Sequence, residues 1–131
     1  MATIAIRQGE RQVTALDADD IFVFGSNLAG RHGKGAAKYA MQKFHAEYGV
    51  GRGLTGQCYA LPTLTGSLGH RSLADVREEY RLFGEFASTK PELTFYLTAC
   101  GSGLAGQDVA DMRQAAEDYC DYPNVIPWWH F

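Results

Sequence analysis

The chain is poor in cysteine, and the three that it has follow no pattern of a disulfide or metal framework. Cys58, Cys100 and Cys120 are spread along 131 residues without a C-x-x-C pair. An odd count without a C-x-x-C pair fits a reducing compartment better than a disulfide scaffold. No ligand pairs show the spacing of a zinc site. We therefore expect a cytoplasmic protein with no bound metal and no cofactor.

Long apolar runs and an excess of basic charge are absent as well. No stretch approaches the ~20 residues that a membrane span needs, and the N-terminus lacks the apolar core of a signal peptide. Lys and Arg number 12 against 15 Asp and Glu, giving a net charge of −3. Surfaces that bind nucleic acid are normally basic. Neither a membrane nor a nucleic acid is therefore an expected partner.

What the chain does have is an ordinary globular composition with alternating strand and helix patterns. Hydrophobic residues make up 46% and charged residues 21%, and 131 residues fit one domain covering 1–131. Apolar periodicity predicts strands over 3–6, 21–24, 57–61, 93–99 and 124–127, and helices over 36–48, 73–87 and 109–119. This alternation predicts a three-layer α/β/α sandwich with a mixed, largely parallel sheet.

Two glycine-rich segments are the main functional feature. Residues 25–35, the first glycine loop, and residues 101–106, the second glycine loop, each follow a predicted strand and precede a predicted helix. Such a junction gathers backbone N–H groups and the positive end of a helix dipole, which together bind anions. Parallel sheets bind ligands at the carboxyl ends of their strands. Two such loops predict a ligand with more than one phosphate.

Neither loop completes a familiar nucleotide motif. Gly101, Gly103 and Gly106 match the dinucleotide fingerprint G-x-G-x-x-G, but the 25 residues that follow are too few for the rest of that fold. The first loop begins like a P-loop, yet Arg31-His32 stand where Lys and Ser or Thr belong. The alternative that these glycines only make tight turns stays open.

The order and spacing of these motifs resemble those of the macro domain family. Strand 21–24 leads into Gly25-Ser26-Asn27, and the segment 32–37 then resembles the family's first ADP-ribose-binding loop. Segment 98–106 resembles its second, phosphate-binding loop, and 59–63 fits the strand between them. The resemblance covers roughly residues 20 to 126. It is strongest to a compact macro-like group found in phages and bacteria.

The resemblance implies binding of ADP-ribose or a related NAD-derived nucleotide between the two loops. Asn27 matches the residue that contacts the distal ribose, and the second loop matches the one that wraps the diphosphate. The implied binding residues are Gly25, Ser26, Asn27, Gly33, Gly35, Ala36, Gly101, Ser102, Gly103, Leu104, Ala105 and Gly106. An ADP-ribosylated protein is a second partner that the resemblance implies.

Catalysis is an open alternative, because the acids of the family's hydrolytic classes are missing. Lys34 stands near the place of one such Asp, and Ala105 stands in the place of another. The substitutes are His32, Lys34 and Asp108. Each has a structural alternative, since His32 can bond to backbone, Lys34 can be a solvated loop lysine, and Asp108 can cap a helix. An ADP-ribosyl hydrolase, a non-catalytic binding or sequestering module, and an assembly protein on the same fold all remain possible.

Two further features need a structure to interpret. Cys58 and Cys100 lie on predicted strands and are expected to be buried, with a thiol nucleophile at Cys100 as the alternative. The aromatic ending 127–131 is expected to cap the sheet, with a stacking platform or dimer contact as the alternative.

Overall fold

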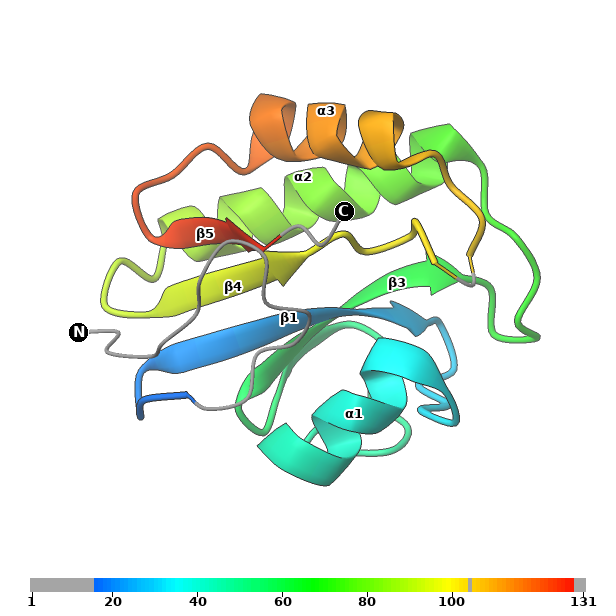
Figure 1. Cartoon of the computed structure of the whole chain (residues 1–131), viewed down its shortest axis with the longest axis horizontal. Coiled ribbons are helices and arrows are strands. Elements are labelled where there is room, and N and C mark those ends of the chain that lie inside the picture. The colour runs from blue at the N-terminus through cyan, green and yellow to red at the C-terminus, as the bar shows by residue number, and fades with distance from the viewer. Residues whose placement is uncertain (1–15, 104, 129–131) are drawn as a thin grey trace.

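A five-stranded sheet with the order β2-β3-β1-β4-β5 forms the middle layer of the molecule (Figure 1). The computed structural model describes residues 16–103 and 105–128. The strands are β1 (Asp20–Asn27), β2 (Gly53–Thr55), β3 (Cys58–Leu64), β4 (Thr94–Thr98) and β5 (Val125–Trp128). The strand predicted over 3–6 and the ending 129–131 lie outside the described residues.

Three helices cover the two faces of this sheet. β1 pairs in parallel with β3 and β4, β4 pairs in parallel with β5, and β2 is the one described strand that runs antiparallel to its neighbour, β3. Helix α1 (Gly35–Phe44) lies on one face, and α2 (Leu73–Ser88) and α3 (Val109–Tyr119) lie together on the other (Figure 1). The predicted sandwich with a mixed, mostly parallel sheet is therefore confirmed.

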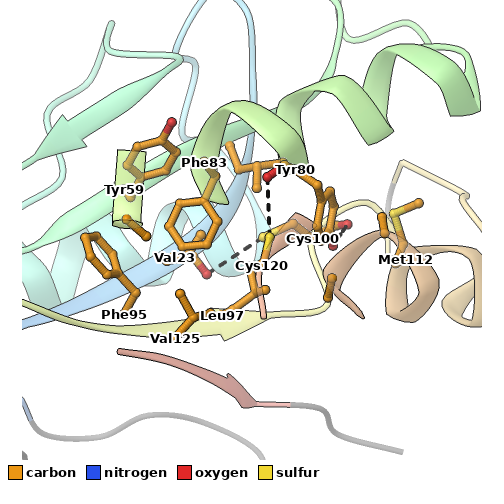
Figure 2. Close-up of a cluster of buried hydrophobic side chains, with 14 of the residues drawn as sticks. Val23, Tyr59, Tyr80, Phe83, Phe95, Leu97, Cys100, Met112, Cys120 and Val125 are labelled. Carbon is orange, nitrogen blue, oxygen red and sulfur yellow. Dashed lines mark hydrogen bonds between the residues drawn. The ribbon is translucent and has the colours of Figure 1, made fainter. Parts of the chain in front are cut away.

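β1 is the central strand because both of its faces are apolar. Ile21 and Val23 belong to the cluster under α2 and α3, whereas Phe22 and Phe24 belong to the cluster under α1. Figure 2 shows the first cluster, in which aromatic rings of α2 and the neighbouring strands surround Val23. Trp128 is buried in the second cluster, as expected for an aromatic cap.

The helix predicted over 36–48 is shorter than expected. It ends at Phe44 because His45 takes a left-handed conformation, with φ at 66°, and donates its backbone N–H to the Ala40 carbonyl. Tyr48, which the periodicity placed on the apolar stripe, is 65% exposed. The glycine-rich stretch after it, predicted to be a break, contains the short strand β2, whose three residues are too few for periodicity to detect.

β1 and β3 both extend further than the apolar runs predict. β1 continues through Gly25 and Ser26 to Asn27, and β3 continues through Pro62 to Leu64. Pro62 is tolerated because the pairing of β2 with β3 covers only Cys58–Ala60, so no ladder bond is lost on that side. The first glycine loop therefore begins inside the sheet.

Candidate functional site

The two glycine loops leave the sheet at the same edge, where the carboxyl ends of β1, β3 and β4 lie together (Figure 1). Gly25, at the start of the first loop, lies next to the first residues of the second loop. A Cβ built on Gly25 would lie 3.5 Å from the Thr63 hydroxyl oxygen of β3 and 3.6 Å from the backbone of Cys100 and Gly101. The bases of the two loops therefore lie so close that a methyl group added at Gly25 would be in van der Waals contact with the second loop.

Ser26 and Asn27 shape the first loop from within. Both side chains are buried, and the Ser26 hydroxyl donates to the Gly51 carbonyl at 2.5 Å. The Asn27 amide donates to the Arg31 carbonyl at 2.8 Å, while its oxygen accepts the Arg31 backbone N–H at 2.9 Å. Asn27 thus closes a turn of its own loop. A contact between Asn27 and a ribose stays a prediction.

Helix α1 begins without a cap, unlike the other two helices. Lys34 occupies its N-cap position and makes no side-chain cap bond, and the first turn holds no acidic residue. Ser72 caps α2 and Asp108 caps α3, and each of these helices also carries an Asp in its first turn. The first N–H groups of a helix lack intrahelical partners. Those of α1 are therefore left to solvent or to an anion.

The charge around this helix start is positive although the whole chain is negative. Residues 21–46 contain four Lys and Arg and no Asp or Glu. Arg31 and Lys34 are exposed and make no ion pair with any described residue. Local charge and the α1 dipole therefore act in the same direction on an incoming anion.

The second loop is held by its own backbone. The Gln107 N–H bonds to the Gly101 carbonyl at 2.8 Å, and the Gly106 N–H bonds to the Gly103 carbonyl at 3.0 Å. The Ser102 hydroxyl donates to the Ala99 carbonyl. Within the described part of the chain, the backbone N–H groups of Gly103 and Ala105 have no hydrogen-bond partner. Leu104, one of the implied binding residues, lies outside the described residues.

Gly33 and Gly103 are glycines that the fold itself does not require. Both are exposed, neither has a left-handed φ, and a Cβ built on either would meet no atom of the described residues within 4 Å. Gly30 and Gly51 differ, because a Cβ there would lie 2.3 Å and 2.4 Å from neighbouring backbone. Tight turns or packing therefore account for Gly30 and Gly51 but not for Gly33 and Gly103. The space beside those two glycines is open to a ligand.

The structure does not bring the three candidate catalytic residues together. His32 is fully buried on the α1 side, where its ring lies 5.2 Å from that of Phe24 and its Nε2 lies 2.9 Å from the Glu47 carbonyl oxygen. Since a carbonyl only accepts, Nε2 carries the hydrogen, and Nδ1 is buried without a partner among the described residues. Asp108 caps α3 on the opposite face by accepting from the Ala110 N–H. Lys34 is exposed at the start of α1.

The cysteines behave as buried apolar residues, as expected. Cys100 is 2% exposed, and burial raises the pKa of its thiol to about 12. Figure 2 shows it packed among the side chains beneath α2, where the Tyr80 hydroxyl also donates to the Cys100 carbonyl at 2.7 Å. The thiol of Cys100 is thus protonated at neutral pH, and the geometry gives no support to a nucleophilic role.

A cavity of about 410 Å³ lies away from the glycine loops, between α3 and β5. Its walls combine apolar strand residues with charged residues of the α3 region, and it contains no residue of either loop. The lining residues are Leu97, Arg113, Ala116, Glu117, Cys120, Asp121, Val125 and Pro127. The sequence motifs and this cavity therefore mark different parts of the molecule.

Sequence reasoning missed the residues that stand behind the second loop. His70, an exposed residue that no motif in the sequence includes, places Nδ1 2.8 Å from the Ala105 carbonyl oxygen. The Gln107 side chain donates to the Arg71 carbonyl at 2.9 Å. These partners are 35 and 36 residues apart, so no local pattern in the sequence could have indicated them.

Comparison with known proteins identifies the fold. No family model and no curated protein matches the chain. Two solved structures are similar over most of their length. A protein of unknown function from Bacteroides thetaiotaomicron has a TM-score of 0.62 and 14% identity, over 87% of this chain and 88% of that one. The macrodomain of Mycobacterium tuberculosis DarG has a TM-score of 0.60 and 18% identity, over 94% and 95%.

The chain has a macro domain fold. None of the helices in residues 16–103 and 105–128 is long and apolar enough to cross a membrane. Across the same residues, no group of three or more His, Cys, Asp or Glu side chains is placed to hold a metal ion.

Proposed function

We propose that this macro domain binds ADP-ribose or a related NAD-derived nucleotide at the carboxyl edge of its sheet. The observation that carries the proposal is the pair of exposed glycines, Gly33 and Gly103, whose missing side chains the fold does not explain. They lie on the two loops that meet at Gly25. Glycine at such positions lets a ligand approach the backbone closely.

The chemistry of the two loops suits a diphosphate. The N–H groups of Gly103 and Ala105, which have no partner among the described residues, lie on one side, and the start of α1, without a side-chain cap, lies on the other. Both provide donors without negative charge. Gly33, Gly35 and Ala36 are exposed at the start of α1, where the diphosphate and the distal ribose would lie. The remaining proposed contacts are Gly25, Ser26, Asn27, Gly101, Ser102, Leu104 and Gly106.

The geometry favours binding over catalysis. His32 is buried and Asp108 is engaged as a helix cap, so two of the three candidate catalytic groups already have structural roles. A module that senses or sequesters an NAD-derived nucleotide needs only the donors described above. Hydrolysis of an ADP-ribosyl linkage is the alternative, and an ADP-ribosylated protein would be its substrate.

Calorimetric titration of the whole chain with ADP-ribose tests the proposal. We expect saturable binding of one nucleotide per chain, weaker binding of ADP, and weaker binding still of AMP, because each truncation removes contacts to one part of the site. Absence of binding at millimolar ADP-ribose would overturn the proposal and favour an assembly role for the fold.

Catalysis is decided separately by incubating an ADP-ribosylated protein with the domain and following released ADP-ribose by mass spectrometry. Release that disappears in His32→Ala, with the fold intact by circular dichroism, supports a catalytic His32. Binding without release identifies a binding module.

A further inference from the structure

A rigid turn after β3 places His70 beside the second glycine loop. The Thr65 N–H bonds to the Gly69 carbonyl and the Gly69 N–H bonds to the Thr65 hydroxyl, each at 2.9 Å. An isolated antiparallel bridge between Leu64 and His70 closes the turn onto the end of β3. The backbone of His70 is therefore fixed relative to the sheet.

The His70 ring fastens the second loop to this turn. The distance from His70 Nδ1 to the Ala105 carbonyl oxygen is 2.8 Å. A carbonyl oxygen only accepts, so Nδ1 is the nitrogen that carries the hydrogen. The ring also lies against Gly106, where an added Cβ would be 3.3 Å from Cε1. The hydrogen bond to Ala105 and the ring contact with Gly106 together restrain two consecutive residues of the loop.

A charge network centred on the buried carboxylate of Glu79 holds the segment behind His70. Arg71 Nη1 donates to the Pro62 carbonyl at 2.8 Å and to Glu79 at 2.9 Å. The Glu79 carboxylate, on α2, is 3% exposed and is also bound by the guanidinium of Arg52. The Arg71 carbonyl in turn accepts from the Gln107 side chain. The turn and the second loop are thus anchored to the same helix.

We propose that His70 is a positioning residue of the nucleotide site, acting through the Nδ1–H···O bond to Ala105. The bond directs the Ala105 carbonyl at His70, so this partially negative oxygen is not free to turn toward an anion. It also fixes the backbone that presents the N–H groups of Gly103 and Ala105. The expected effect of His70 on nucleotide affinity rests on the proposed ADP-ribose binding. Its restraint of the second loop does not depend on that proposal.

Three substitutions at one position test the bond by calorimetry with ADP-ribose. The asparagine amide nitrogen reaches about the place of histidine Nδ1, whereas that of glutamine reaches about the place of Nε2. We expect His70→Ala and His70→Gln to weaken affinity about tenfold, the worth of one hydrogen bond, and His70→Asn to stay within about threefold of the native protein. Glu92→Ala, an exposed change in the turn before β4 at the opposite end of the sheet, is the control and is expected to leave affinity unchanged.

Hydrogen exchange in the nucleotide-free protein supplies a readout that does not depend on the ligand. The bonded N–H groups of Gly106 and Gln107 are expected to exchange about tenfold faster in His70→Ala and His70→Gln, and at the native rate in His70→Asn. If that pattern appears but ADP-ribose does not bind, the proposed function falls and the role of His70 in holding the loop stands. Equal exchange in all variants, or His70→Asn behaving like His70→Ala, overturns the positioning role.

Discussion

Replacing Gly103 by leucine separates a glycine kept for a ligand from one kept for folding. In the free protein a side chain at this position has open space and no strained φ, so we expect the free energy of unfolding to change by less than about 0.5 kcal/mol. In the complex the same side chain would occupy the place of a phosphate. We expect the complex to lose two hydrogen bonds between loop N–H groups and the phosphate, each worth about 1.5–3 kcal/mol of binding free energy. The total of about 3–6 kcal/mol corresponds to a loss of affinity of about 100-fold or more.

The assay pairs urea denaturation with calorimetric titration of ADP-ribose on the same preparation. Ser88→Leu serves as the control, because it adds the same side chain at the exposed carboxyl end of α2, beyond the glycine loops. Affinity of Gly103→Leu within threefold of the native protein would refute the placement of the ligand beside this glycine. A large fall in stability would instead show that Gly103 serves the fold.

Three further predictions concern the scaffold and its chemistry. Gly84→Ala should lower the free energy of unfolding in urea by more than about 2 kcal/mol, because a Cβ would lie 1.9 Å from the Tyr119 carbonyl oxygen and force α2 from α3. Glu79→Ala should cost about 3 kcal/mol in the same assay, since it leaves Arg71 without its buried partner; an unchanged midpoint would argue against the network. Burial raises the pKa of Cys58 and Cys100 from 9.0 to about 12, so neither should react with iodoacetamide at pH 8 until the chain unfolds. The thiols of the unfolded chain lose their protons at a lower pH than the buried thiols of the folded chain. Their contribution to the free energy of unfolding is therefore full below pH 9 and falls as the pH rises toward 12. Urea denaturation at pH 7 and at pH 10 would detect this fall.

The layer architecture could be predicted from the sequence because its determinants are local. The continuous apolar run of Ile21–Phe24 indicates a strand buried on both faces, and the alternation of strands and helices allows few arrangements. Ser72 and Asp108 are of the residue types that cap helices, and in the structure each caps the helix that follows it. What periodicity could not determine was where elements stop. The end of α1 depends on the left-handed backbone of His45, which no apolar stripe encodes.

The sequence could predict which loops meet at the candidate site, but not how the side chains in those loops are placed. Glycine-rich junctions are visible in the sequence, and the parallel sheet then brings them to one edge. The inward turn of Asn27 onto Arg31 and the burial of His32 depend on three-dimensional packing, so residue type alone could not indicate them. The bond from His70 to the second loop depends on the closure of the turn after β3 in the same way.

The caps explain how a chain of net charge −3 can keep one edge suited to the proposed anionic ligand. All three helices follow strands whose carboxyl ends lie at that edge, so each could present its positive end there. α2 and α3 neutralise theirs with a capping side chain and a first-turn aspartate. α1 has neither, and the 26 residues around its start, 21–46, carry no acid. The aspartates at this edge are thus those that cap or begin α2 and α3, and the net charge of the whole chain says little about which ligand the start of α1 would suit.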